Sequence, residues 1–281
     1  SAIFAPVQDL GLIIIDEEHD SSYKQDNAPR YHARQVAAWR AARHSGCRLV
    51  LGSATPCLES YTYARLGQFG HWTMSQRATE QRLPSVEMLD LRKYRLRSGE
   101  DLSAPLVSAL EVALSKGQQA VLLYNRRGFS RYLQCQDCGE VTHCRHCSIA
   151  MTVHHSPRRL LCHYCGHQRS LPNECPKCLG SRLREQGSGT EHLELELAQR
   201  LPQAKILRMD RDTTQRQGSH GDLLTTFGRG EADILLGTQM VAKGLDFPNV
   251  TLVGVIGADQ GLHLPDFRAA ERTLQLLVQV A

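Results

Sequence analysis

The sequence has little that would place it in a membrane or mark it as a strongly basic protein. Its longest apolar stretch near the start, residues 10–15, is far shorter than the roughly 20 residues that a membrane span needs. Lys and Arg total 33 against 29 acidic residues, so the net charge is only +4, too small to prove or exclude a nucleic-acid partner. No targeting segment is recognisable, and we expect a cytoplasmic protein with no membrane contact.

The features of a disulfide-stabilised secreted domain are also missing. Such domains are short and carry cysteines spread over the whole fold, whereas this chain has 281 residues and holds eight of its ten cysteines between Cys135 and Cys178. The clustering indicates a reducing compartment and a metal site rather than a disulfide framework. The other two cysteines, Cys47 and Cys57, are expected to be buried thiols.

The first 80 residues alternate between aliphatic and helical segments, as in an α/β protein. The run at 10–15 is typical of a central parallel strand, and a second strand is predicted at 48–51 after a helix over 33–44. This order predicts a parallel sheet with a helical crossover. The polar and basic stretch at 76–99 is expected to be a linker.

A second α/β unit begins with a predicted helix over 105–116 and a strand over 120–124. At Cys135 this pattern stops, and it resumes only after Gly187. The elements expected there are a helix over 191–200, a strand over 205–208, a helix over 223–227 and strands over 234–236 and 251–256. The cysteine-rich block is therefore expected to be an insertion in the second α/β unit.

The cysteine-rich block contains four C-x-x-C pairs: CQDC, CRHC, CHYC and CPKC. Two residues between cysteines allow a tight turn to aim both thiolates at one ion, and two such turns complete a tetrahedral zinc site. The 14 residues between Cys147 and Cys162 are close to the usual ribbon spacing of about 15 to 20, so we expect the inner pairs to share one ion and the outer pairs another. The expected ligand sets are Cys144, Cys147, Cys162 and Cys165 for one ion, and Cys135, Cys138, Cys175 and Cys178 for the other.

A sequential pairing, first with second and third with fourth, is the alternative, although the five residues between Cys138 and Cys144 are a short connection for one site. A redox C-x-x-C would occur once beside a βαβ unit, and no pair is followed by the histidine of a haem attachment site. The nearby histidines are not expected to be ligands, because thiolates already fill both sites; they are His143, His146, His163 and His167. With no open coordination position evident, a structural role is favoured over a catalytic one.

An acidic motif, Asp16-Glu17-Glu18-His19, directly follows the first predicted strand. Carboxylates at the C-terminal edge of a parallel sheet are the chemistry of P-loop NTPases, in which an Asp holds Mg²⁺ and the next Glu polarises the attacking water. The spacing excludes a zinc-protease H-E-x-x-H motif. Exposed acidic residues at a strand end are the simpler alternative.

Three further segments follow predicted strands and strengthen the interpretation as a motor. They are Gly52-Ser53-Ala54-Thr55-Pro56, Leu123-Tyr124-Asn125-Arg126-Arg127-Gly128 and Gly237-Thr238-Gln239-Met240-Val241-Ala242-Lys243-Gly244-Leu245-Asp246-Phe247. Their order, together with the acidic motif and the four C-x-x-C pairs, resembles superfamily 2 helicases and, among them, the bacterial replication-restart helicases with an eight-cysteine insertion. The resemblance covers essentially the whole chain.

The resemblance implies an α/β fold of two RecA-like helicase lobes, the first truncated, with a two-zinc insertion in the second. The implied domains are the end of lobe 1 (1–80), the start of lobe 2 (81–134), the zinc insertion (135–180) and the truncated rest of lobe 2 (181–281). The implied activity is ATP-dependent unwinding of DNA in the 3′ to 5′ direction, with binding of forked DNA and initiation of primosome assembly. ATP with Mg²⁺ and two Zn²⁺ are the implied cofactors, and PriB, DnaT and single-strand-binding protein the implied partners.

The family's motifs also imply roles for single residues. Asp16 would hold Mg²⁺, Glu17 would activate water, and His19 would couple the nucleotide to Ser53 and Thr55. Facing the nucleotide from lobe 2 would be Gly244 and Asp246. The residues implied in DNA or inter-lobe contacts are Thr238, Gln239 and Lys243, with Arg126 and Arg127 either phosphate binders or plain surface arginines.

The segment 21–34 alternates aromatic and basic residues, which suits base stacking combined with phosphate contact. It resembles the aromatic-rich loop that links DNA binding to hydrolysis in related helicases. The candidate DNA contacts are Tyr23, Lys24, Arg30 and Tyr31. Alternatively Tyr31 anchors a core, and for Trp39, on an alanine-rich helix, a core position is the preferred prediction.

The chain departs from the family's pattern at two points. It contains no G-x-x-x-x-G-K-[ST] motif, whose amides and lysine hold the phosphates, and the last family motif is cut off after residues 275–281. The chain also lacks an initial methionine, so we expect it to be a fragment of a longer protein. We expect the fragment alone to be inactive. Two other functions stay open: another superfamily 2 translocase acting in DNA repair, and a non-catalytic zinc-ribbon module that binds nucleic acid or protein.

Overall fold

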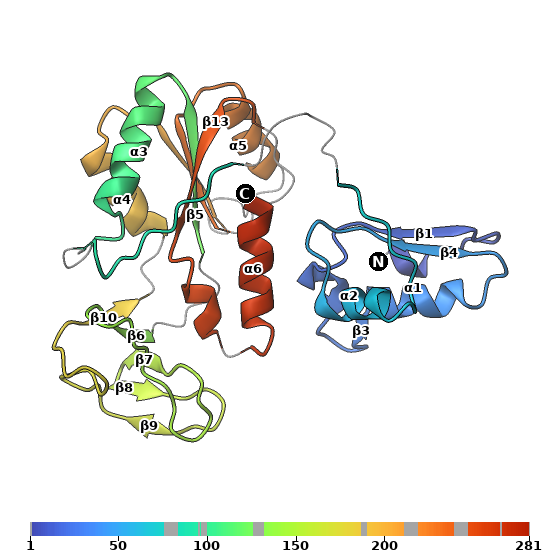
Figure 1. The fold of residues 1–281 in the computed structure, drawn as a ribbon, viewed down its shortest axis with the longest axis horizontal. Coiled ribbons are helices and arrows are strands. Elements are labelled where there is room, and N and C mark those ends of the chain that lie inside the picture. The colour runs from blue at the N-terminus through green and yellow to red at the C-terminus, as the bar shows by residue number, and fades with distance from the viewer. Residues whose placement is uncertain are drawn as a thin grey trace. The chain divides into compact units, whose positions relative to one another are not determined.

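The computed structural model describes residues 2–75, 84–94, 96, 100–125, 132–186, 190–210, 219–238, 247–264 and 266–280. The chain forms two compact units, Ser1–Arg82 and Leu83–Ala281 (Figure 1). None of the helices in these described ranges is long and apolar enough to cross a membrane.

The first unit is built on two parallel strands, β1 (Leu12–Ile15) and β4 (Arg48–Leu51), which pair in register. Helix α1 (Ala33–Ala41) connects them and packs on both strands, and helix α2 (Leu58–Arg65), which the sequence pattern did not predict, follows β4. The smaller elements are the 3₁₀ helices η1 (Ala2–Phe4) and η2 (Ser21–Tyr23) and the short antiparallel strands β2 (Lys24–Gln25) and β3 (Tyr31–His32).

Burial in the first unit is one-sided. Ile15 is buried, whereas Leu12 and Ile14 are 51% and 65% exposed, so the expectation of a strand covered on both faces is not met in the described part of this unit. Helix α1 approaches the strands through two small residues one turn apart, Ala33 and Ala37, both buried. Its large side chains therefore lie elsewhere on the helix.

Two aromatic residues of the first unit differ in their surroundings. Trp39 is 58% exposed, with the Arg43 guanidinium 3.6 Å from the centre of its ring, so the predicted core position for Trp39 is wrong. Tyr31 is half-buried, and its ring contacts that of Phe4 edge-on, with 5.0 Å between ring centres.

The second unit contains a parallel four-stranded sheet in the order β11 (Ile206–Met209), β12 (Ile234–Gly237), β5 (Gln119–Tyr124), β13 (Val250–Ile256). The unit also contains the helices α3 (Ala104–Ser115), α4 (Thr190–Arg200), α5 (Ser219–Gly228) and α6 (Ala269–Val280), and the 3₁₀ helix η4 (Gln260–His263).

Alternate residues of β5 pack into two different hydrophobic cores. Leu122 and Tyr124 pack with α3 and α4, and Val121 packs with Phe227 of α5. A strand buried on both faces explains the continuous apolar run of β5.

The cysteine-rich block lies between β5 and α4 and folds as a separate antiparallel sheet (Figure 1). Its strand order is β10 (Leu183–Gln186), β6 (Tyr132–Cys135), β7 (Thr152–His155), β8 (Arg158–Leu161), β9 (Gln168–Arg169). Its core is small: Leu133, Met151, Val153 and Leu160, with the side chains of Cys144 and Cys162. The predicted insertion of this block into the second α/β unit is confirmed.

Candidate metal centres and acidic motif

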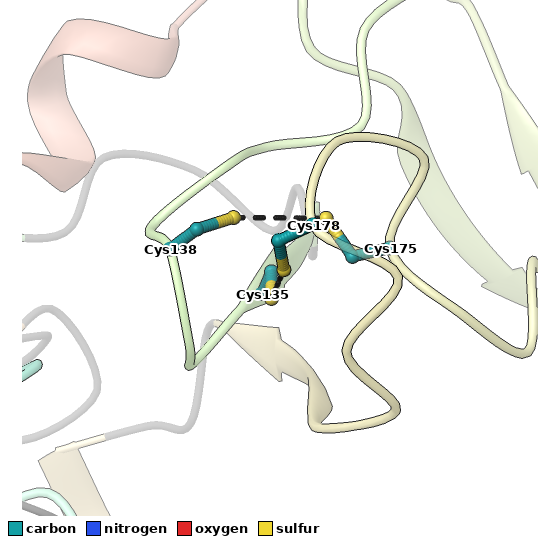
Figure 2. Close-up of side chains that lie close together, drawn as sticks. All are labelled: Cys135, Cys138, Cys175 and Cys178. Atoms are coloured by element: carbon teal, nitrogen blue, oxygen red, sulfur yellow. Dashed lines mark hydrogen bonds between the residues drawn. The ribbon is translucent and has the colours of Figure 1, made fainter.

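The eight clustered cysteines come together in two groups of four. The outer group consists of Cys135, Cys138, Cys175 and Cys178, and the inner group of Cys144, Cys147, Cys162 and Cys165. Within each group all sulfur atoms lie within 4.8 Å of one another, and none of these cysteines forms a disulfide. The structure thus brings together the nested sets rather than the sequential ones. Figure 2 shows the outer group, whose side chains converge from the end of β6 and the turn after it on one side and from the loop before β10 on the other.

The sulfur spacing fits a tetrahedral zinc ion. Four thiolates at a Zn–S distance of about 2.3 Å would stand about 3.8 Å apart. The measured Sγ–Sγ distances are 3.6 Å between Cys135 and Cys178, 3.7 Å between Cys138 and Cys175, and 3.6 Å between Cys144 and Cys165. Thiolate is also the ligand type that zinc prefers in structural sites. Both groups therefore fit zinc binding.

All four C-x-x-C pairs form the same backbone turn, which we call the cysteine turn. The residue after each pair donates its N–H to the carbonyl of the pair's first cysteine at 2.9 Å, and that cysteine donates its own N–H to the carbonyl five residues ahead at 2.8–2.9 Å. The residue after the pair has left-handed φ in every case: 79° at Gly139, 55° at Ser148, 74° at Gly166 and 59° at Leu179. This conformation bends the chain back so that both sulfurs point to one side.

Backbone N–H groups stabilise the thiolate form of two of the cysteines, Cys162 and Cys175. The N–H of His146 donates to Cys144 Sγ and that of Lys177 to Cys175 Sγ, each at 3.4 Å. Burial opposes ionisation of Cys162, but hydrogen bonds from the N–H groups of Cys165 and Tyr164 outweigh it and lower the pKa of Cys162 to about 7. The N–H of Cys178 is the main cause that lowers the pKa of Cys175 to about 7. In the same groups the pKa of Cys147 is raised to about 12, mainly by its hydrogen bond with Cys165, and the pKa of Cys178 is also raised to about 12. The turns therefore favour the thiolate at Cys162 and Cys175, and zinc would have to displace the protons of Cys147 and Cys178.

The remaining cysteines and the nearby histidines take no part in the two groups. Cys57 is buried as predicted, whereas Cys47 is only half-buried, so its predicted burial is wrong. The histidines beside the pairs are exposed or half-buried, namely His143, His146, His163 and His167. In the described ranges the ligand atoms of both groups are sulfurs alone.

A third cluster of possible metal ligands has structural contacts of its own. It consists of Asp101, His192 and Glu196. Glu196 accepts the backbone N–H groups of Asp101 at 2.7 Å and Leu102 at 3.2 Å, just before α3 begins. Asp101 in turn pairs with Arg184 of β10 at 2.8 Å. These contacts use the carboxylates to connect the end of the insertion to α3 and α4.

The acidic motif presents two exposed carboxylates, Asp16 and Glu17, where β1 ends. Glu17 has a left-handed backbone, with φ of 46°, which is uncommon for a residue with a side chain. His19 Nδ1 lies 3.4 Å from Glu17 Oε2 and 2.7 Å from Ser53 Oγ, and Ser53 Oγ accepts the N–H of Thr55 at 2.9 Å. The structure thus brings together the predicted residues Glu17, His19, Ser53 and Thr55.

Asp16 lies beside the turn that follows β4. A Cβ atom placed on Gly52 would be 3.4 Å from Asp16 Oδ1, and the Gly52 carbonyl accepts the N–H of Glu18 at 3.0 Å. Tyr23 also donates its hydroxyl to the Asp16 carbonyl at 2.7 Å. The two motifs therefore form one site at the C-terminal edge of the sheet, where α/β proteins place ligands.

Sequence reasoning assigned no role to Glu18, yet it is the buried member of the motif, with 1% exposure. Its carboxylate accepts hydrogen bonds from the Cys57 N–H at 2.7 Å, from Arg34 at 2.5 Å and from the Ser60 hydroxyl at 3.1 Å. Three consecutive acidic residues give no signal of which one points inward. Glu18 is distinguished from the other two only in the folded structure, where Arg34 and the start of α2 lie next to it.

The predicted DNA contacts are only partly within the described residues. Lys24 and Arg30 are exposed and Tyr23 and Tyr31 half-buried, on or beside the β2–β3 pair. Thr238 follows β12 and is half-buried. The predicted residues that lie outside the described ranges are Arg126, Arg127, Gln239, Lys243, Gly244 and Asp246.

Comparisons with known proteins agree over the whole chain. Residues 144–169 match the PriA DNA helicase Cys-rich region domain, and residues 185–278 match the helicase conserved C-terminal domain. The chain is 54% identical over its full length to the replication restart protein PriA of Bacillus subtilis, 45% to that of Chlamydia trachomatis and 42% to that of Haemophilus influenzae. It spans 35%, 38% and 38% of those relatives, respectively. The chain is therefore similar over its whole length to replication restart proteins named PriA, of which it spans little more than a third.

Proposed function

We propose that the protein to which this chain belongs is an ATP-dependent DNA helicase that moves 3′ to 5′, binds forked DNA and initiates primosome assembly for replication restart. The observation that carries the proposal is the pair of four-cysteine groups inserted in a helicase sheet, in a chain 54% identical to a named replication restart protein. The chain would supply the end of lobe 1 (1–80), lobe 2 (81–134 and 181–281) and the zinc insertion (135–180).

The two cysteine groups would each hold one zinc ion. Bound zinc supplies a cross-link that can contribute most of the folding free energy of a small module. The insertion needs such a cross-link, because two of the six buried side chains of its core are themselves cysteines. Arg182 pairs with Asp137, and Lys177 pairs with Glu140 at 3.0 Å, so charge pairs also connect the first and last cysteine turns.

The acidic motif would serve ATP hydrolysis. Mg²⁺ bound with ATP supplies charge neutralisation at the phosphates, and oxygen ligands of the kind that Asp16 presents suit it. Glu17 would orient the attacking water and take its proton. His19, in contact with both Glu17 and Ser53, would fix the direction of the Glu17 carboxylate relative to the turn 52–55. From lobe 2, Gly244 and Asp246 would face the nucleotide.

DNA would contact the β2–β3 pair and lobe 2. Exposed Lys24 and Arg30 suit phosphate contact, and half-buried Tyr23 and Tyr31 suit base stacking. The lobe 2 contacts would come from Thr238, Gln239, Lys243, Arg126 and Arg127. Primosome partners would be PriB, DnaT and single-strand-binding protein.

The test compares wild-type full-length protein with Glu17→Gln and with Glu59→Gln, which removes an exposed carboxylate from α2. Loss of the base should lower ATP turnover on forked DNA by about 100-fold or more, abolish unwinding and leave fork binding unchanged. Glu59→Gln should match the wild type in all three measurements. Normal ATP turnover and unwinding by Glu17→Gln would contradict the role of Glu17. Fork binding by the wild type and by Glu17→Gln alike, with no ATP-dependent unwinding by either, would favour a non-catalytic zinc-ribbon module. Unwinding without a preference for forks in the wild type would favour a repair translocase.

A further inference from the structure

We infer that Glu18 is a positioning residue: it holds the catalytic carboxylate of Glu17 in its working orientation and connects it, through Arg34, to the β2–β3 pair. This inference rests on the proposed function, since it assigns to Glu18 and Arg34 a part in the same ATPase site. It is carried by the burial of Glu18, its hydrogen bonds and the backbone of Glu17.

The Glu18 carboxylate is fixed from three directions. Its Oε1 accepts the N–H of Cys57, the residue before α2, at 2.7 Å. Its Oε2 accepts from Arg34 of α1 at 2.5 Å and from Ser60 of α2 at 3.1 Å. With 1% exposure and a cationic partner, this carboxylate cannot turn outward without leaving Arg34 uncompensated.

The inward direction of Glu18 determines the outward direction of Glu17. The N–H of Glu18 is bound to the Gly52 carbonyl at 3.0 Å, and the Glu17 carbonyl accepts the N–H of Asp20 at 2.8 Å. Between these two fixed points Glu17 has φ of 46°, a region that is unfavourable for a residue with a Cβ atom. The conformation persists because its neighbours hold it, and Glu18 is the neighbour with the most anchoring contacts. Release of Glu18 would let Glu17 relax to an ordinary backbone conformation and move its carboxylate away from His19.

Arg34 extends the connection to the proposed DNA-binding segment. Its Nη1 contacts Glu18 Oε2, Cys57 Sγ and Ser60, while its Nη2 lies 3.3 Å from His32 Nε2. His32 ends β3 and pairs with Lys24 of β2. A displacement of the β2–β3 pair is therefore passed to Arg34 and from there to the carboxylate that anchors Glu17. This path consists of direct contacts within the first unit.

The experiment uses the full-length protein and measures kcat and KM for ATP with saturating single-stranded DNA, the Kd for that DNA, and thermal unfolding. Glu18→Gln keeps the shape but loses the charge, and should lower kcat by about tenfold or more because the catalytic group is misplaced, while KM and Kd stay within about twofold. Glu59→Gln is the matched control and should not change kcat. The kcat of Arg34→Gln should fall as much as that of Glu18→Gln. The kcat of the double variant should be no lower than that of either single variant, because each single substitution removes the same contact between Glu18 and Arg34.

Arg34→Lys is the conservative variant, since it keeps a cation beside Glu18, and it should retain at least about half of the wild-type kcat. If Glu18→Gln fails to fold, the comparison of Arg34→Lys with Arg34→Gln decides, and equal kcat values in these two would overturn the inference. A normal kcat in Glu18→Gln, or equal losses in kcat and in DNA affinity, would overturn it as well. Absence of DNA-stimulated turnover in the wild type would instead overturn the proposed function, and this inference with it.

Discussion

Ser148 and Leu179 occupy the same position in two of the four cysteine turns, and both have left-handed backbones, with φ of 55° and 59°. In the other two turns this position is held by Gly139 and Gly166. The left-handed conformation costs a residue with a side chain roughly 1–2 kcal/mol, a cost that glycine avoids. The four turns thus share one geometry, and two of them hold it under strain.

Replacement of Ser148 or Leu179 by glycine should therefore stabilise the protein. We expect each substitution to raise the free energy of unfolding by up to about 1 kcal/mol, because relief of strain outweighs the greater chain entropy of glycine in the unfolded state. Little packing is lost, since Leu179 is 73% exposed and Ser148 is exposed as well. Denaturant unfolding of the zinc-loaded chain measures the change.

The reverse substitutions are the matched controls. A Cβ atom on Gly139 or Gly166 would have nothing within 4 Å, so Gly139→Ala and Gly166→Ala test the backbone alone. Each should destabilise the chain by about 1 kcal/mol. Unchanged stability in these two variants would show that the left-handed position carries no strain.

The nested grouping of the cysteines has its own test. Wild type should hold about two zinc ions per chain. The double variant Cys138→Ser with Cys175→Ser removes two ligands from the outer group and should lose one ion. The double variant Cys138→Ser with Cys147→Ser damages both groups and should lose both ions. Sequential pairing demands the opposite order, so zinc content after dialysis, measured by atomic emission, separates the two arrangements.

The main strands of the α/β units could be predicted because a buried parallel strand is a run of consecutive apolar residues in the sequence. Strand β5, with apolar residues from Ala120 to Tyr124, is the clearest case. Helix α2 could not be predicted, because two tyrosines and a threonine make it a weak helix former and tertiary contacts determine its start. Those contacts are the bond from Cys57 N–H to Glu18 and the cap that Cys57 Sγ gives to Ser60 N–H.

The candidate sites show the same division. The spacing of the C-x-x-C pairs predicts both cysteine groups, since each turn is local and only the choice of partner turn depends on the fold. The burial of Glu18 and the exposure of Trp39 depend on which face of α1 meets the strands. Small Ala33 and Ala37 hold that face, and composition alone favoured the larger tryptophan.

Glu196 should be important for the stability of the second unit. Its carboxylate accepts the N–H groups of half-buried Asp101 and of Leu102, which is 1% exposed, so Glu196→Ala would leave the buried Leu102 N–H without this acceptor. We expect a loss of about 2 kcal/mol in the free energy of unfolding. Gln199→Ala, an exposed substitution on the same helix, should change it by less than about 0.5 kcal/mol. If both variants changed the free energy of unfolding in urea equally, the hydrogen bonds from Asp101 and Leu102 to Glu196 would contribute nothing to stability.

His263 should make the stability of the second unit depend on pH. Its ring lies 5.4 Å from that of Tyr132 and 6.3 Å from that of His143, so η4 contacts the insertion here. Burial is the main cause that lowers the pKa of His263, and His143 adds to it, while Asp259 and Glu140 oppose it. A histidine with a lowered pKa in the folded state contributes its full stability above the unfolded pKa of about 6.5. This contribution is lost as the pH falls toward the folded value, because the unfolded state binds the proton first.

The measurement is denaturant unfolding at pH 7.5 and pH 6 for the wild type and for His263→Phe, which keeps a ring beside Tyr132. The wild type should lose more stability between these pH values than the variant. Acid release of metal affects both proteins alike and cancels in the comparison. His71→Phe removes an exposed histidine of the first unit and should keep the wild-type pH dependence. Parallel stability curves for wild type and His263→Phe would contradict the prediction, because they would mean that proton uptake on unfolding does not involve His263.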